Sequence, residues 1–367
     1  MPTRLPSPLA LAAVVALAGT LASPAVQAQS GVTVSGILDL ALRQTSNEGA
    51  GSLKSVISGS NSTSRIAFSG REDLGGGLFA GFHLEHGILA DTGAGAGGTS
   101  KFWDRRSTVS VGHTAWGEIR LGRDFVPSYN AWSRYDPFSY VGAARSANFV
   151  SSTPTGPIRS AFGSNANTTV RADNALQWLL PRGWGGLEGE VMLAPGEGGS
   201  ATAGNAKVVG ARIGYADKAW GVNVASTRSS NSLTTTGRFT DQGVGGHWQV
   251  TPTWRVTAAW RAFEQATAKQ TITMLAAVGT FGQHEVKASY LKTDMSGKVG
   301  TTAIAANDAS QIGLGYVYHL SKRSALYATV AEIDNDGAAR FVITDGPAGI
   351  VAAGRSRGYE LGIRHRF

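Results

Sequence analysis

The stretch Val32–Arg43, VTVSGILDLALR, alternates between apolar and polar residues at a period of two. Valine and leucine fall on one face, whereas threonine, serine, Asp39 and Arg43 fall on the other. The final stretch, Tyr359–Phe367, has the same alternation. Because successive side chains of a strand point to opposite faces, the pattern predicts β-strands. Similar segments follow one another along the chain, so the sequence predicts an all-β fold.

The two faces of these segments distinguish between two kinds of all-β protein. The polar face of a β-sandwich looks at bulk water and favours lysine, threonine and glutamate. Here that face mixes glycine, serine and arginine, and the apolar face carries tyrosine and tryptophan near the segment ends. This is typical of a barrel in lipid, with an apolar exterior and a polar interior. Hydrocarbon cannot satisfy open strand edges, so we predict a closed antiparallel transmembrane β-barrel.

The composition excludes several other classes. Only 16% of the residues are charged, which is too few for a disordered chain, and the absence of cysteine excludes disulfide scaffolds and cysteine-based metal sites. The 33 lysines and arginines outnumber the 25 acidic residues, but they are scattered along the chain, which argues against a nucleic-acid partner. The seven histidines form no HExxH motif. We therefore expect neither a metal nor a cofactor.

Residues 1–28 are organised like a secretory signal peptide. They contain Arg4, then an apolar run, then Val26-Gln27-Ala28 with small residues where a signal peptidase reads. The apolar run is well short of the ~20 residues that span a bilayer, which argues against a membrane anchor. Cleavage after Ala28 leaves one predicted domain, residues 29–367. We expect an exported protein of the bacterial outer membrane.

The connections between the strand segments alternate between short turns and long loops. A short turn is expected at Asp73–Gly77, for example, whereas glycine- and serine-rich loops are expected at Thr45–Thr63 and Asn335–Arg355. Outer-membrane barrels have this asymmetry, and the segments number about sixteen, within the range of bacterial barrels. A barrel of about that size encloses an aqueous channel, whereas one of about eight strands is filled by its own side chains.

One connection, Phe125–Thr169, is much longer than the others and carries four prolines and several aromatic residues. A loop of this length is usually functional or disordered, and its aromatic content argues against disorder. We predict that this loop, about residues 125–169, folds into the lumen and narrows the channel. The charged residues assigned to it are Asp124, Arg134 and Asp136.

Several motifs resemble the trimeric general porins of the β-proteobacterial outer membrane. They are Val32–Asp39, Ser64–Phe68, Glu72–Leu78, Gly117–Arg123, Arg171–Asn174 and Gly362–Phe367. The pair Arg105-Arg106 is similar to basic positions of the anion-selective members. The resemblance implies a sixteen-stranded homotrimer whose third extracellular loop bends inward, opposite an arginine cluster at Arg65, Arg105 and Arg171. It also implies that Phe367 is the terminal aromatic residue recognised by the barrel-insertion machinery; alternatively, it only anchors the last strand at the interface.

The alternation can be applied to these arginines independently of the resemblance. It predicts that Arg65 and Arg171 face the lumen, because their apolar neighbours take the outer face. In the fourth segment, however, strict alternation turns Arg106 inward and not Arg105. A β-bulge would reconcile the two, so both residues stay candidates for the constriction. Four further charged residues are predicted to face the lumen: Arg43, Asp39, Arg120 and Asp173.

These observations favour a passive channel for small hydrophilic solutes. Arginines in a narrow channel concentrate anions, and the net charge of +8 favours anion preference; alternatively, the arginines only balance nearby carboxylates. An adhesin with long binding loops, or a barrel hydrolase, is the alternative function, although no catalytic spacing is found. The expected partners are outer-membrane lipids including lipopolysaccharide, the barrel-insertion machinery and small anionic solutes.

Overall fold

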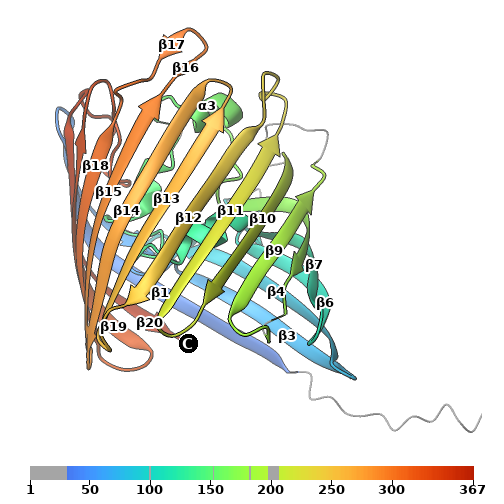
Figure 1. Ribbon diagram of the computed structural model, residues 1–367. Helices are drawn as coiled ribbons and strands as arrows, with labels where there is room; N and C mark the ends of the chain where they lie inside the picture. The colour runs from blue at the N-terminus through green and yellow to red at the C-terminus, as the bar shows by residue number, and fades with distance from the viewer. Residues whose placement is uncertain (1–30, 99–100, 152, 182, 197–205) are drawn as a thin grey trace, which may run out of the picture.

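The computed structural model describes residues 31–98, 101–151, 153–181, 183–196 and 206–367. Within this part of the chain, sixteen antiparallel strands form one closed ring (Figure 1). The ring closes where β1 (Val32–Asn47) pairs with β20 (Arg355–Arg366). β2 (Gly51–Ser58) and β3 (Arg65–Gly75) pair with the upper and lower halves of the same edge of β1, and so form one interrupted strand. The prediction of a closed barrel of about sixteen strands is confirmed.

The remaining wall strands follow in chain order, each paired with its neighbours. They are β4 (Leu78–Leu89), β6 (Arg106–His113), β7 (Gly117–Phe125), β8 (Arg171–Leu179), β9 (Leu187–Ala194), β10 (Lys207–Ala216), β11 (Trp220–Ser230), β12 (Phe239–Gln249), β13 (Trp254–Gln265), β14 (Ala268–Phe281), β15 (His284–Ser296), β18 (Ala309–His319) and β19 (Ser324–Asn335). Three two-residue strands lie in the loops: β5 (Ala94–Gly95), β16 (Lys298–Val299) and β17 (Thr302–Ala303).

The two faces of the wall have opposite character. On β1, Val34 and Leu42 are 53% and 64% exposed, whereas Asp39 and Arg43 are buried. In a water-soluble protein this arrangement would be unfavourable, because apolar surface is exposed and charges are buried. It suits a barrel whose exterior meets hydrocarbon and whose interior is polar.

The turns at one end of the barrel are short. Between β3 and β4, Gly75, Gly76 and Gly77 have φ values of +82°, +59° and +87°. Side chains are strained in this region of backbone conformation, whereas glycine adopts it readily. The run of three glycines therefore reverses the chain within a few residues.

The long connection between β7 and β8 lies inside the ring of strands (Figure 1). It contains α2 (Pro127–Ser133), the 3₁₀ helix η1 (Ser146–Phe149) and α3 (Pro157–Phe162). α2 contacts β9–β12, and α3 contacts β12–β14. None of the helices in the described ranges is long and apolar enough to cross a membrane.

The apolar core lies between this connection and one side of the wall. The ring of Phe149 packs 5.1 Å from that of Phe341, and Phe162 packs 5.0 Å from Phe239. These rings belong to one buried cluster that joins the connection to β12–β15, β18 and β19. The opposite side, from β3 to β8, carries charged side chains on its inner face, among them Glu85, Arg106 and Arg120.

Candidate pore constriction

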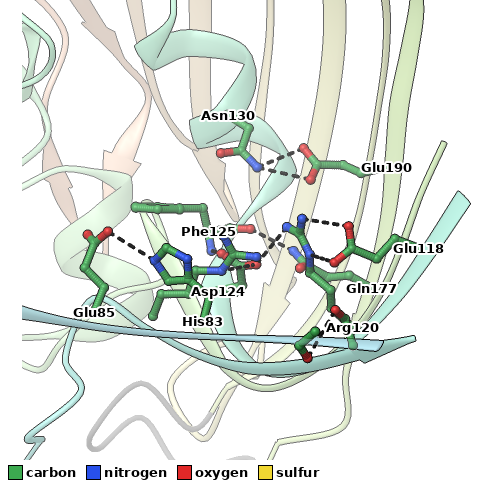
Figure 2. Close-up of polar contacts among 12 residues, drawn as sticks. His83, Glu85, Glu118, Arg120, Asp124, Phe125, Asn130, Gln177 and Glu190 are labelled. Atoms are coloured by element: carbon green, nitrogen blue, oxygen red, sulfur yellow. Dashed lines mark hydrogen bonds and ion pairs between the residues drawn. The ribbon is translucent and has the colours of Figure 1, made fainter. Parts of the chain in front are cut away.

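Charged groups gather on the inner wall around Glu85, on β4. Arg105 forms an ion pair with the Glu85 carboxylate, and Arg65 Nε lies 3.7 Å from its other oxygen. His83 Nε2 lies 3.4 Å from the same carboxylate (Figure 2). The structure therefore brings Arg65 and Arg105 together around one acid, from β3 and from the residue just before β6.

Arg105 and Arg106 both reach charged partners on the inner wall, and no bulge is needed for this. Arg106 opposes Glu85 in the β4–β6 register, which runs without a shift, and its Nε lies 3.2 Å from Asp124. Arg105 precedes the strand, so the alternation of β6 does not govern it. Both residues therefore stay candidates for the constriction.

Arg171 contacts the connection, although strict alternation along β8 does not account for its position. The β7–β8 register shifts between Gly122 and Asp124, and Arg171 then opposes Phe125. Its guanidinium lies 4.4 Å from the centre of the Phe125 ring, and its Nε donates a 2.8 Å hydrogen bond to the carbonyl of Arg105. Among the described residues, no carboxylate lies within 4.0 Å of this guanidinium.

The aromatic residues beside Arg171 connect it to α2. The Phe125 ring stacks on Tyr129 at 4.9 Å, and Tyr129 meets Tyr140 edge-on at 5.1 Å. Burial raises the pKa of Tyr129, and the charges of Arg171 and Arg105 oppose that rise. Both arginines are therefore close enough to act electrostatically on the connection inside the barrel.

Asp173 lies on the opposite face from the one that a period of two predicts. Arg123 continues the outward series of Ile119 and Leu121 on β7, and its Nη1 lies 2.5 Å from Asp173. Lys101 forms an ion pair with the same carboxylate. The register shift turns Asp173 to the outer face, because an extra residue in one strand turns the side chain beside it over. The assignment of Asp173 to the lumen is corrected accordingly.

The other three lumen-facing predictions are engaged in inner-wall networks. Asp39 accepts hydrogen bonds from the backbone N–H groups of residues 60, 61 and 62 and from the hydroxyl of Tyr327. Arg43 Nε donates to Glu360 at 2.6 Å, and its Nη1 lies 2.7 Å from Asp345. Arg120 is paired with Glu118 and Asp124, at 2.7 and 3.3 Å (Figure 2).

The connection itself presents little negative charge. Asp136 is the one acidic residue in the sequence from 126 to 169. It is 5% exposed, and it accepts hydrogen bonds from the N–H groups of residues 138, 140 and 146 and from the Ser146 hydroxyl. Burial raises the pKa of Asp136, while these hydrogen bonds oppose the rise. Arg134 is exposed and pairs with Glu188 on β9.

Arg261, on β13, holds the connection to the wall and was not among the predicted site residues. It is 1% exposed, and its Nε and Nη2 donate to Asp241 on β12 at 2.8 and 2.7 Å. The same Nη2 donates to the carbonyl of Thr169, and the Ser128 hydroxyl donates to Asp241 at 2.7 Å. The pair therefore binds both ends of the connection. The alternation of β13 places Arg261 on the inner face, but it does not show which inward residues hold the connection to the wall.

Tyr140 links the middle of the connection to the same ion pair of Arg261 and Asp241. Arg261 Nη1 donates to its hydroxyl at 3.4 Å. Burial raises the pKa of Tyr140 to about 12, with the charge of Arg261 opposing the rise. The phenol is therefore protonated at neutral pH and remains both a donor and an acceptor.

The inner wall facing the connection has more positive than negative groups. Five arginines, at positions 65, 105, 106, 120 and 171, lie here with three carboxylates that pair with arginines, at 85, 118 and 124. Arg145 on the connection adds a further cation, whose Nε donates to Asn148. Within the described ranges no group of three or more potential ligand side chains could hold a metal ion.

A closed barrel with an apolar exterior, a charged interior and a segment folded inside it defines a membrane channel. The chain belongs to the Gram-negative porin family, whose model matches residues 10–338. Porins of the outer membrane are passive channels and not enzymes, and this chain is an outer-membrane porin.

Individual relatives are similar over nearly the whole chain. Outer membrane porin protein 32 of Delftia acidovorans is 34% identical, over 96% of this chain and 99% of that protein. The solved structure of the anion-selective porin from Comamonas acidovorans covers 92% of this chain and 100% of its own, with 30% identity and a TM-score of 0.77. Structures of OmpT from Vibrio cholerae, such as one with 15% identity and a TM-score of 0.62, share the fold alone.

Proposed function

We propose that this porin conducts small hydrophilic solutes with a preference for anions, and that the constriction lies between the inner connection and Arg65, Arg105, Arg106 and Arg171. The observation that carries the proposal is the guanidinium of Arg171, which has no carboxylate partner among the described residues and lies beside a connection whose single acid is buried. The name of the Comamonas relative, an anion-selective porin, agrees with it.

Selectivity of this kind requires no chemical step. A hydrated solute diffuses along the lumen, and its local concentration depends on the field of the fixed charges. Clefts lined by one sign of charge with low-dielectric walls focus that field. Rings of arginine and lysine accordingly line anion-conducting pores. The carboxylate of Asp136 is buried and enclosed by its hydrogen bonds, so it is not presented to solutes at the channel surface.

A planar bilayer with a KCl gradient tests the proposal directly. The reversal potential is expected to have the sign of a chloride-preferring channel, because the net positive charge at the constriction favours the anion. The preference should weaken as salt is raised from 0.01 M to 1 M, since the Debye length falls from about 30 Å to about 3 Å. A cation-preferring reversal potential at low salt would show that the pairing of arginines with carboxylates cancels their field.

We further propose that the protein is a homotrimer. The support is an outer surface that lipid would not solvate well. Trp103 packs 5.9 Å from Phe68 and Phe102 stacks 4.6 Å from His86, so the segment before β6 covers part of the outer wall. Beside it lies the charged cluster of Arg123, Asp173 and Lys101. Charged groups on a lipid-facing wall are costly at mid-membrane depth, and a neighbouring subunit would remove them from lipid.

Electrophoresis without boiling tests this assembly. The expected result is a heat-sensitive band near three times the monomer mass, which cross-linking before heating preserves. Replacing Phe102 with aspartate should shift the band toward the monomer while far-ultraviolet circular dichroism still reports β-structure. A single monomeric band that cross-linking leaves unchanged would contradict the trimer.

The proposal also covers export and insertion. Residues 1–28, the proposed cleaved signal peptide, lie outside the described residues, and residues 29–367 would be the mature domain. Phe367 exchanges two backbone hydrogen bonds with Gly36, at 3.0 and 3.1 Å, so the chain end is paired with β1. Phe367 is 45% exposed, which agrees with a terminal aromatic residue that insertion machinery recognises. Outer-membrane lipids, including lipopolysaccharide, would surround the exterior.

A further inference from the structure

Three cations gather at the ends of β10–β12 that adjoin the long loops. Lys207 begins β10, Arg228 lies near the end of β11, and Arg238 directly precedes β12. All three are exposed, and no carboxylate of the described residues lies within 4.0 Å of any of them. Arg228 is on the outer face, because it continues the series of Val222 and Val224, which are 43% and 52% exposed.

Several outward-facing cations further round the ring are neutralised. Lys269 lies 2.9 Å from Glu264, and Lys292 lies 2.6 Å from Asp294. Arg355 and Arg357 on β20 are paired in the same way with acids of β19. The cluster of Lys207, Arg228 and Arg238, called here the basic cluster, therefore differs from these four cations in having no counter-charge among the described groups.

An apolar groove of about 700 Å³ lies on the same outer wall, next to the basic cluster. Small residues, Gly189, Ala211 and Ser226, line it together with larger apolar side chains. The latter are Trp178, Val191, Ile213, Val224, Val244 and Trp260.

The strand register fixes the position of the groove relative to the cations. Ser226, which lines the groove, opposes Ala211 on β10 and Gln242 on β12. Two residues further toward the loops, Arg228 opposes Val209 and Thr240. Lys207 lies one further outward step along β10, opposite Ser230. The outer wall thus changes from an apolar groove to positive charge that has no ion-pair partner among the described residues, over four residues or roughly 13 Å along the strand.

We propose that the groove and the basic cluster together bind one phosphorylated glycolipid of the outer leaflet, with an acyl chain in the groove and phosphates on the cations. Each buried methylene of an acyl chain stabilises such binding, and cations near a membrane surface attract anionic headgroups. Guanidinium groups also form bidentate hydrogen bonds with phosphate. The cluster spans three neighbouring strands, roughly 10 Å, which suits a headgroup bearing two phosphates better than a single phosphodiester.

Native mass spectrometry of the folded, detergent-extracted assembly tests the site, with bis-phosphorylated lipid A as the probe. Lys207→Ser combined with Arg228→Ser is expected to weaken binding about thirtyfold, from the contribution of roughly 1 kcal/mol per cation near a membrane surface. Ala211→Phe, which fills the groove and keeps the cations, should also weaken it. The matched control is Lys269→Ser, an outward lysine already paired with Glu264.

Measurements with two other lipids identify the ligand. Dephosphorylated lipid A should bind the unsubstituted protein as weakly as bis-phosphorylated lipid A binds the double variant. Phosphatidylglycerol, with one phosphate, should bind more weakly than bis-phosphorylated lipid A. Equal binding of phosphatidylglycerol, or unchanged lipid A binding by the double variant, would overturn the proposal. Conductance and reversal potential should be unchanged in these variants, so failure here is distinguishable from failure of the channel proposal.

Discussion

Arg261→Met is expected to increase single-channel conductance and to reduce anion preference. The guanidinium is 1% exposed and joins Asp241 to the carbonyl of Thr169 and the hydroxyl of Tyr140. The substitution removes these attachments together. The connection between β7 and β8 would then be released from β12 and β13, and a connection free to move away from the arginines leaves a wider channel.

The same variant is expected to be less stable. Removing one partner of a buried ion pair leaves an uncompensated charge, here Asp241, at a cost of about 3–5 kcal/mol. The heat-induced loss of the folded band on electrophoresis should therefore occur at a lower temperature. Combining Arg261→Met with Asp241→Leu removes the buried charge and should recover part of this stability without restoring the hydrogen bonds to the connection.

Arg255→Met is the matched control, because Arg255 lies on the same strand and its Nε contacts Gln249 at 3.1 Å, away from the connection. It should leave conductance and selectivity close to those of the unsubstituted protein. If Arg261→Met folds and conducts with unchanged amplitude and reversal potential, the ion pair does not set the position of the connection. The fold would then have to hold the connection through its apolar contacts alone.

Arg171→Ser is expected to reduce the chloride-to-potassium permeability ratio more than any other single arginine substitution at the constriction. The charge of Arg171 has no carboxylate within ion-pairing distance among the described residues, whereas Arg106 and Arg120 have Asp124 close by. The positive charge of Arg106 or Arg120 is partly offset by the nearby carboxylate of Asp124. The positive charge of Arg171 is not offset in this way, so its removal should change the field in the channel most.

The size of this effect follows from the Coulomb interaction. Two unit charges 4 Å apart interact by about 1 kcal/mol in bulk water, and more strongly where the channel wall lowers the dielectric constant. A change of about 1 kcal/mol corresponds to roughly a fivefold change in the permeability ratio at low salt. Reversal potentials across a KCl gradient near 0.1 M measure this change in the permeability ratio.

Two comparisons interpret the result. Arg65→Ser should have a smaller effect in the same direction, because Arg65 shares Glu85 with Arg105. Arg228→Ser, on the outer face, removes one charge without touching the lumen and should leave the ratio unchanged. Equal permeability ratios in Arg171→Ser, Arg65→Ser and the unsubstituted protein would locate the selectivity outside this arginine cluster.

The sequence predicted the class of fold because its evidence is local. Alternation within Val32–Arg43 is enough to assign a strand with one lipid-facing and one polar side, and the observed burial on β1 follows it. The same rule predicted that Arg106 faces the lumen, and in the structure Arg106 opposes Glu85 in the β4–β6 register. It did not apply to Arg105, since that residue precedes the strand.

Alternation also failed beyond the register shift of β7 and β8. The shift between Gly122 and Asp124 reverses the facing of Asp173, which pairs on the outside with Arg123. A bulge is a property of how two strands pair, and the sequence of one strand does not determine that pairing. Arg171 nevertheless reaches Phe125, through contacts that periodicity does not express.

By itself the sequence determined a closed, wide barrel, because peptide groups in hydrocarbon need partners along every strand edge and the side-chain period is visible residue by residue. Only the tertiary structure decided how the inner connection is held and which charges remain uncompensated. Arg261 meets a carbonyl 92 positions earlier in the chain, and Arg43 meets a carboxylate 317 positions later. Such partners are brought together by closure of the ring, so their pairing follows from the three-dimensional register and not from any local pattern.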